Sequence, residues 1–228
     1  IENRGTFDIN NVVQITGNLN YIKNTGNFYV DKTLTIGGDM DYMHNTGTFK
    51  VNANGITGHN INKIDNDGTW ELNKKFNFNQ ITTFDNSGTF YLDDRYLDAT
   101  NIIISGKLYQ HEGHSGYMTL KATTLTLNSG AEINVNGLGH PGGSKRSNGQ
   151  GPGKGYYCGT SKGGTGASYG GKGGAGYACG TESSAYGSLS QPTDLGSGGG
   201  GGYISDGGDG GGAIKIEVSD TLTINGVI

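Results

Sequence analysis

The chain has 228 residues, of which 45 are glycine and three are proline, and only 32% are hydrophobic, a low share for an ordinary globular core. The formal net charge of −4 comes without a basic block, which argues against nucleic acid or an anionic membrane as a partner. No apolar run approaches 18 residues, so we expect no membrane span, and the scarcity of proline excludes collagen.

The first 90 residues repeat a seven-residue motif of the form apolar-x-Asn-x-Gly-x-aromatic. It reads IENRGTF at 1–7, IKNTGNF at 22–28, MHNTGTF at 43–49, IDNDGTW at 64–70 and FDNSGTF at 84–90. Apolar and polar residues alternate within each repeat, which indicates strands, and no segment has a helical period. A repeat of about 21 residues predicts an all-β parallel β-helix, in which each repeat is one coil of a solenoid.

In such a solenoid like residues stack on like residues from coil to coil. We expect a buried aromatic stack formed by Phe7, Phe28, Phe49, Trp70 and Phe90. We also expect a ladder of side-chain amides, each hydrogen-bonded to the next, formed by Asn3, Asn24, Asn45, Asn66 and Asn86. A missing rung would leave its neighbours unpaired. The glycine two residues after each asparagine is interpreted as giving the corner its backbone freedom.

The pattern becomes looser over residues 91–136 and is then interrupted. Residues 137–212 hold 30 of the 45 glycines. The segments LTLN at 125–128 and LTIN at 222–225 look like the same position on successive coils, although they are 97 residues apart. We therefore divide the chain into solenoid coils at 1–136, a glycine-rich insertion at 137–212 and a continuation of the solenoid at 213–228.

The insertion is expected to be a compact lobe in which tyrosines pack and glycines let backbones approach closely. Cys158 and Cys179 lack the spacing of zinc ligands, so we expect a disulfide formed in an oxidising compartment, worth about 3 kcal/mol. The chain begins within a repeat and shows no signal peptide, and we interpret it as a piece of something longer.

Several glycine-containing motifs match nucleotide or hydrolase signatures only superficially. GLGHPG at 137–142, GASYGGK at 166–172 and GTSKG at 159–163 are not followed by a helix, which those sites need. HEGH at 111–114 is not a zinc motif. We therefore expect no cofactor, no metal and no enzymatic activity. The one dense charged cluster, Asp93, Asp94, Arg95 and Asp98, is interpreted as a solvated loop, with a catalytic or binding site as the alternative.

Two segments resemble known classes of surface protein. Repeats such as IKNTGNFYVDKTLTIGGDMDY, over about residues 1–92, resemble haemagglutinin-type repeats of large secreted bacterial adhesins. That resemblance implies a right-handed parallel β-helix, although aliphatic residues are commoner there at the aromatic position. The C-terminal part, with YGSLSQPTDLGSGGGGG and GGGAI, looks like glycine-rich segments of very large secreted or surface proteins. Both resemblances imply an extracellular structural role.

Together these patterns predict a stiff rod within a larger adhesin or surface fibre. Its expected partners are further coils or other copies of the same protein, and surface glycans. Open coil ends would be adhesive edges unless they are covered. The alternative is a carbohydrate-binding or carbohydrate-cleaving solenoid of the pectate-lyase-like kind, which would need paired carboxylates on one outward face.

Overall fold

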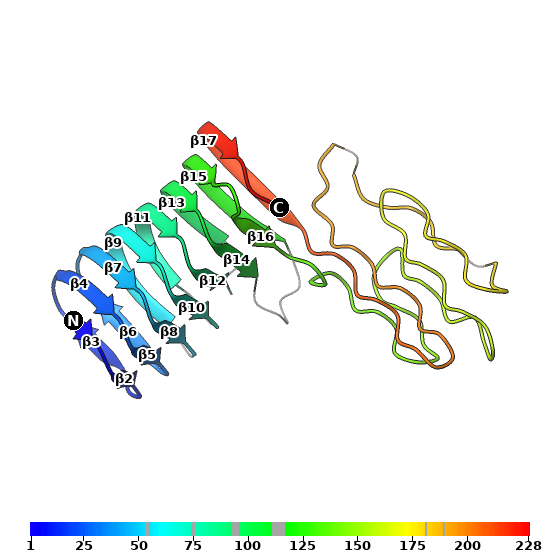
Figure 1. The fold of residues 1–228 in the computed structure, drawn as a ribbon, viewed down its shortest axis with the longest axis horizontal. Helices are drawn as coiled ribbons and strands as arrows, with labels where there is room; N and C mark the ends of the chain where they lie inside the picture. Colours follow the sequence, from blue (N-terminus) through cyan, green and yellow to red (C-terminus); the bar gives the residue numbers. More distant parts are fainter. Residues whose placement is uncertain (53–54, 74–75, 93–95, 111–116, 181, 189) are drawn as a thin grey trace. The chain divides into compact units, whose positions relative to one another are not determined.

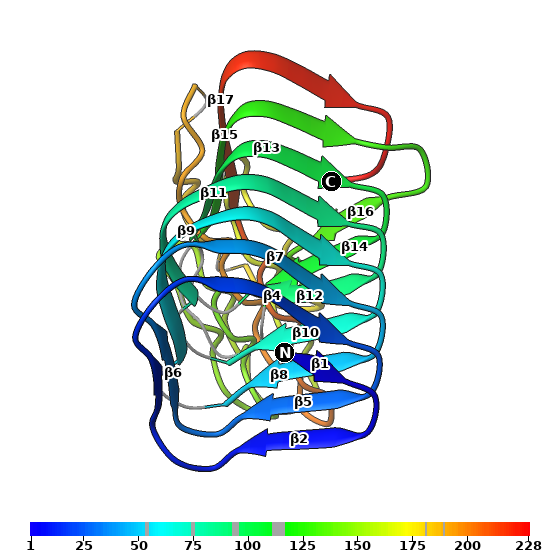
Figure 2. The same cartoon turned by 90° about the vertical axis from the view of Figure 1, so that its left-hand side faces the viewer.

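The computed structural model describes residues 1–228 apart from 53–54, 74–75, 93–95, 111–116, 181 and 189. The secondary-structure elements of these described residues are all β-strands. The strands run parallel in two sheets (Figures 1 and 2). Paired residues of neighbouring coils are 21 positions apart where Glu2 faces Lys23 and where Asn24 faces Asn45. The predicted all-β solenoid of about 21 residues per turn is therefore confirmed.

Each coil contributes to both sheets. The ten-stranded sheet contains β1 (Glu2–Asn3), β4 (Leu19–Asn24), β7 (Met40–Asn45), β9 (Gly55–Asn66), β11 (Phe76–Asn86), β13 (Tyr96–Ile104), β15 (Met118–Leu127) and β17 (Ile214–Ile224), with β3 (Val13–Ile15) and β6 (Thr33–Ile36) beside them. The seven-stranded sheet contains β2 (Thr6–Ile9), β5 (Asn27–Val30), β8 (Thr48–Val51), β10 (Thr69–Leu72), β12 (Thr89–Leu92), β14 (Lys107–Gln110) and β16 (Glu132–Asn134).

The strands of the larger sheet lengthen along the solenoid. In the coil that contains β6 and β7 these are two separate strands. In the next coil, β9 pairs with both of them and continues through the position that separates them. From β9 onward each coil therefore carries one long strand through a bend, which Figure 2 shows as a curved ribbon. The groove described below lies at this bend in the coils from β11 to β17.

The asparagine column is a continuous buried ladder. Each Nδ2 donates to the Oδ1 of the next asparagine, over 2.7 Å from Asn3, 2.8 Å from Asn24 and Asn45, and 2.7 Å from Asn66 to Asn86. The same Nδ2 groups also reach backbone carbonyls, for example that of Thr69 at 3.0 Å from Asn45. Every member from the second to the fifth is fully buried. The ladder ends where Ile104 occupies the position opposite Asn86.

The aromatic column stacks in the solenoid interior. The rings of Phe28 and Phe49 lie 4.7 Å apart at an interplanar angle of 6°. Phe49 and Trp70 are 4.4 Å apart, and Trp70 and Phe90 are 5.5 Å apart. Phe7 contacts Phe28 at 4.9 Å but remains 39% exposed, because it belongs to an end coil. Burial of each further ring contributes about 1.5–3 kcal/mol.

The glycines beside the ladder serve a different purpose from the one the sequence suggested. None of Gly26, Gly47 or Gly68 has a positive φ, so these corners do not need the backbone freedom of glycine. They need its lack of a side chain. A Cβ on Gly47 would lie 2.1 Å from the carbonyl oxygen of Gly26, and the same clash recurs in every coil from Gly26 to Gly106. Only Gly5, in the first coil, has open space around it.

The chain returns to the solenoid after the glycine-rich segment. The Asn225 N–H donates to the Leu127 carbonyl at 2.8 Å, which places Asn225 beside Asn128 in parallel pairing. Val227 continues onto β16, where its N–H donates to Ala131 and its carbonyl accepts from Ile133. Segments 97 residues apart in the sequence thus occupy successive coils.

The described residues form two compact units. The first comprises the solenoid coils, including residues 119–134 and 216–228, and the second is chiefly Val135–Lys215. The second unit holds the Cys158–Cys179 disulfide. Between residues 137 and 212 its described residues form neither helix nor strand.

The glycine-rich unit is instead held by hydrogen bonds that repeat every third residue. His140, Gly143 and Arg146 donate to Gly196, Gly199 and Gly202. On another side of the same segment, Gly198 and Gly201 donate to Gln150 and Ser147. A polyproline II helix has three residues per turn, so residues three apart point to the same side. Segment 196–202 therefore hydrogen-bonds to residues 140–146 on one side and to residues 147–150 on another. A Cβ on Gly198 would lie 2.0 Å from Pro141 O, which explains the glycine content.

The steric account of the corner glycines predicts an asymmetry between two identical substitutions. Gly47→Ala should lower the free energy of unfolding by about 1–3 kcal/mol, because the new methyl group overlaps the Gly26 carbonyl. Gly5→Ala, at the same position of the end coil, should leave it unchanged. Denaturant unfolding of both variants measures the difference, and equal stability of the two would contradict the account.

Candidate functional site

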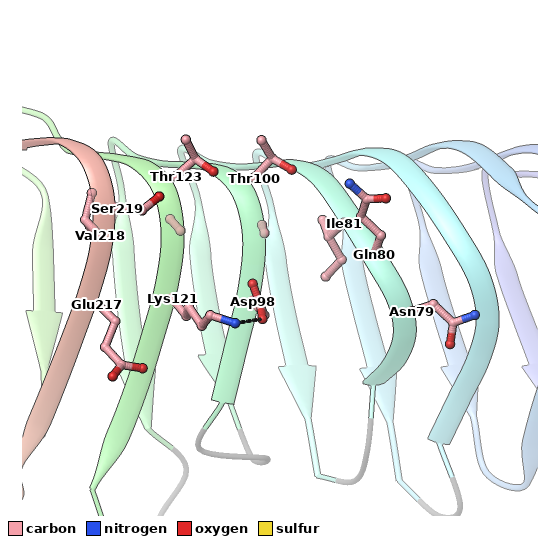
Figure 3. A pocket seen from close by; sticks show the side chains of 12 residues that line it. Asn79, Gln80, Ile81, Asp98, Thr100, Lys121, Thr123, Glu217, Val218 and Ser219 are labelled. Atoms are coloured by element: carbon pink, nitrogen blue, oxygen red, sulfur yellow. Dashed lines mark hydrogen bonds and ion pairs between the residues drawn. The ribbon is translucent and has the colours of Figure 1, made fainter.

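A groove of about 530 Å³ crosses β11, β13, β15 and β17 of the solenoid (Figure 3). These strands are consecutive in the sheet, so at about 4.8 Å per strand the groove extends about 14 Å along the coil axis. Polar and charged residues line the groove together with four apolar ones, and the full set is Asn79, Gln80, Ile81, Asp98, Ala99, Thr100, Lys121, Ala122, Thr123, Glu217, Val218 and Ser219.

An ion pair lies at the centre of the groove. Lys121 faces Asp98 on the neighbouring strand, and its Nζ lies 3.1 Å from the Asp98 Oδ2 (Figure 3). The Tyr96 hydroxyl donates to the same oxygen at 3.0 Å. The hydrogen bond to Asp98 raises the pKa of Lys121, and burial together with the Asp98 carboxylate raises the pKa of Tyr96. Lys121 is therefore an ammonium at neutral pH, which suits it to binding and not to general-base catalysis.

The groove occurs where the column at the bend changes from large to small residues. Met40, Ile61 and Ile81 occupy this column in successive coils. In the next two coils Ala99 and Ala122, which face each other, stand at the corresponding place two residues before the paired Asn101 and Thr124. This loss of side-chain volume coincides with the hollow.

A second cluster of charged residues lies on the outer surface of β7, β9 and β11. Lys63 Nζ is 3.2 Å from both the Asp65 and the Asp85 carboxylates. The Tyr42 hydroxyl donates to Asp65 at 2.9 Å. In the adjoining turn, Asp67 accepts from the Ser87 hydroxyl at 2.5 Å and lies 3.1 Å from the His44 Nε2.

This outer cluster contains residue types that bind metals. Ligand atoms of His44, Asp65 and Asp67 lie within 4.8 Å of one another. However, the Lys63 ammonium already supplies a positive charge to Asp65, and His44 and Ser87 are hydrogen-bonded to Asp67. The cluster is therefore best described as an ion-pair and hydrogen-bond network that joins three coils.

The network changes the acidity of its members. Burial, followed by the hydrogen bond to Asp65, raises the pKa of Tyr42 to about 12. The Ser87 hydroxyl, followed by the His44 ring, lowers the pKa of Asp67. Because the folded chain favours the ionised Asp67, this stabilisation is present above the usual carboxyl pKa and is lost as the pH falls through the lowered value.

Apart from Cys158 and Cys179 in the glycine-rich unit, the residues singled out in the sequence fall in three places. Asp93, Asp94 and Arg95 lie outside the described residues, while Asp98 lies in the groove. Apart from Phe7 in the end coil, the asparagine and aromatic columns are interior, so the ladder and stack serve packing and not surface chemistry. The lining residues Lys121, Thr123 and Glu217 were missed. The signal for them was the change from isoleucine to alanine at the bend, which becomes visible only when the coils are aligned.

Comparison with known proteins gives no further guide to function. No protein-family model, curated protein or solved structure matches the chain. The similarity to haemagglutinin-type repeats thus rests on the motif alone. The described residues contain no helix of the length and apolar character needed to cross a membrane.

The Asp67 environment predicts a specific titration change. Ser87→Ala should raise the pKa of Asp67 towards its ordinary value, because the largest stabilising hydrogen bond is removed. The acid-induced loss of stability should become smaller for the same reason. NMR titration of the Asp67 carboxyl carbon measures the shift. Ser105→Ala is the matched control, since that hydroxyl bonds Asn128 instead; equal titration of Asp67 in both variants would contradict the account.

Proposed function

We propose that this chain is a structural segment of an extracellular or cell-surface protein and acts as a stiff rod of stacked coils. The observation that carries the proposal is the unbroken lateral pairing of the larger sheet from β1 to β17, reinforced by the buried asparagine ladder. Bending such a stack would stretch backbone hydrogen bonds on one side of every coil. Such a segment needs no catalytic residues, and we infer that it is not an enzyme.

The end coils support an assembly role. Leu222 and Ile224 in β17 are each 47% exposed, whereas Leu125 and Leu127, one coil earlier, are fully buried. At the other end Phe7 is 39% exposed. These side chains occupy the columns that neighbouring coils cover elsewhere, and β17 is an edge strand. We infer that further coils, from the same protein or another copy, cover both ends.

The disulfide and the repeat motif support the proposed extracellular location. A disulfide between Cys158 and Cys179 is typical of oxidising compartments, which favours a secreted or surface-exposed segment. The repeats' similarity to those of secreted adhesins points the same way. Within this proposal the segment belongs to an adhesin or surface fibre, with its outward residues free to vary because the fold depends on the inward columns.

A second candidate function is carbohydrate binding by the groove. The observation that favours it is the combination of amides (Asn79, Gln80) and hydroxyls (Thr100, Thr123) with an ion pair along a groove of about 14 Å. Such groups match the donors and acceptors of sugar hydroxyls. We infer that the paired Asp98 and Lys121 supply a charged acceptor and a charged donor to such a ligand.

End-to-end assembly is tested with the intact chain. We expect concentration-dependent oligomers by light scattering and linear particles by electron microscopy. Ile224→Lys should abolish them, because a charge would be buried in the end-coil contact. Thr223→Lys, on the opposite face of the same strand, should not. Monomers at every concentration, or equal assembly of both variants, would contradict association through the coil ends.

Binding in the groove is tested with an array of neutral and acidic glycans. For any glycan that the parent chain binds, we expect Lys121→Ala to lower the affinity about fivefold or more, because the substitution removes a charged donor. Lys32→Ala removes an exposed lysine outside the groove and is the control. Retention that both variants share would assign the binding to another surface.

A further inference from the structure

Four turns of the glycine-rich unit form one surface, here called the turn cluster: residues 143–148, 157–162, 176–180 and 202–206. The Tyr157 N–H donates to the Asn148 side chain at 2.8 Å, which joins the first turn to the second. The disulfide joins the second to the third. The first and fourth turns meet where the Lys145 N–H donates to Asp206 at 2.8 Å. The four turns therefore hold one another in place.

The backbone of this cluster is unusual for so glycine-rich a chain. Among the described residues, three residues other than glycine have positive φ: Arg146 (63°), Ser161 (60°) and Ala178 (54°). All three lie in the turn cluster, one in each of the first three turns. Residues other than glycine adopt a positive φ at an energetic cost, and residues with this backbone conformation cluster at functional sites. Elsewhere in the same unit glycine occupies positive-φ positions, as at Gly151 and Gly187.

Contacts with Tyr203 hold the side chain of Arg146 in place. The Arg146 guanidinium lies 4.3 Å from the centre of the Tyr203 ring, and its Nε donates to the Tyr203 carbonyl at 3.4 Å. Both contacts leave the outer guanidinium nitrogens available for a ligand. An arginine held by an aromatic face loses less freedom when it binds, which favours affinity.

The charge of the turn cluster is opposite to that of the whole chain. Its side chains include three cations, Lys145, Arg146 and Lys162, and one carboxylate, Asp206, which gives +2, whereas the chain carries −4. All four residues are exposed, and the Asp206 carboxylate is occupied by the Lys145 N–H. The surface also presents Tyr177, which is 80% exposed.

We propose that the turn cluster binds an anionic polysaccharide, whose carboxylate or sulfate groups pair with the three cations. The cations come from two turns, so they suit charges spaced along a polymer better than one compact anion. The exposed ring of Tyr177 offers an apolar face to a sugar ring, and serine hydroxyls in the first two turns offer further hydrogen bonds. A net charge of +2 is small for a nucleic-acid site.

The positive φ of Arg146 permits a discriminating variant. Glycine adopts that conformation without strain, so Arg146→Gly removes the cation and leaves the turn intact. Ala178→Gly makes the same kind of backbone change in the third turn without removing a charge, and is the matched control. Thermal unfolding of both variants verifies that they fold.

Binding of the intact 228-residue chain is measured by calorimetry at about 0.15 M salt. The probes are heparin as a sulfated polymer, polygalacturonate as a carboxylated one, neutral dextran, and a single-stranded oligonucleotide. We expect one or both anionic polysaccharides to bind, dextran not to bind, and added salt to weaken binding. Arg146→Gly should weaken it about five- to tenfold and Ala178→Gly should not change it.

Three results would overturn the proposal. The first is that neither anionic polysaccharide binds. The second is that Arg146→Gly, folded like the parent, binds as tightly as Ala178→Gly. The third is that the oligonucleotide binds more tightly than either polysaccharide, which would assign the cluster to nucleic acid.

Discussion

Everything in the first unit depends on how closely one coil approaches the next at the asparagine corner. There the backbone of each coil rests on that of its neighbour, at a distance that admits no side chain on the glycine. The neighbouring asparagine amide is buried at the same corner and needs partners on both sides. An identical amide in the adjacent coil satisfies this need, so the corner repeats itself. From Asn3 to Asn86 the asparagine ladder and the aromatic stack repeat in step with the register of both sheets.

In the glycine-rich unit, too, glycine allows backbones to approach closely. Its hydrogen bonds repeat every third residue, whereas the solenoid repeats about every 21 residues. In the solenoid, one glycine per coil removes a single clash beside a β-strand, as at Gly47. Between residues 137 and 212 the segments bond to neighbours on several sides, so almost every residue of 196–202 meets another backbone. The turn cluster carries Lys145, Arg146 and Lys162 together with the exposed Tyr177 and the disulfide.

The sequence could predict whatever the 21-residue period determines. Alignment of the repeats gives the parallel coils, the neighbours of Asn45 and the return of the chain at Leu222, because stacked coils place equal positions side by side. The period could not reveal why Gly47 is needed, since a clash across coils and a strained φ leave the same trace in a sequence. The groove depends on strand bending and on volume lost at Ala99 and Ala122. The turn cluster depends on non-repeating hydrogen bonds, and Arg146 carries no local signal of its backbone conformation.

The ladder is tested most directly by removing one rung from the middle and one from the end. Asn45→Ala leaves the Asn66 Oδ1 without the Asn45 Nδ2 donor and the Asn24 Nδ2 without its side-chain acceptor, both buried. Asn3 has a ladder partner on one side only. Denaturant unfolding should show a loss of about 2–4 kcal/mol for Asn45→Ala and about 1 kcal/mol for Asn3→Ala. Equal, small losses for both would show that the coils stack without the ladder and would contradict the account.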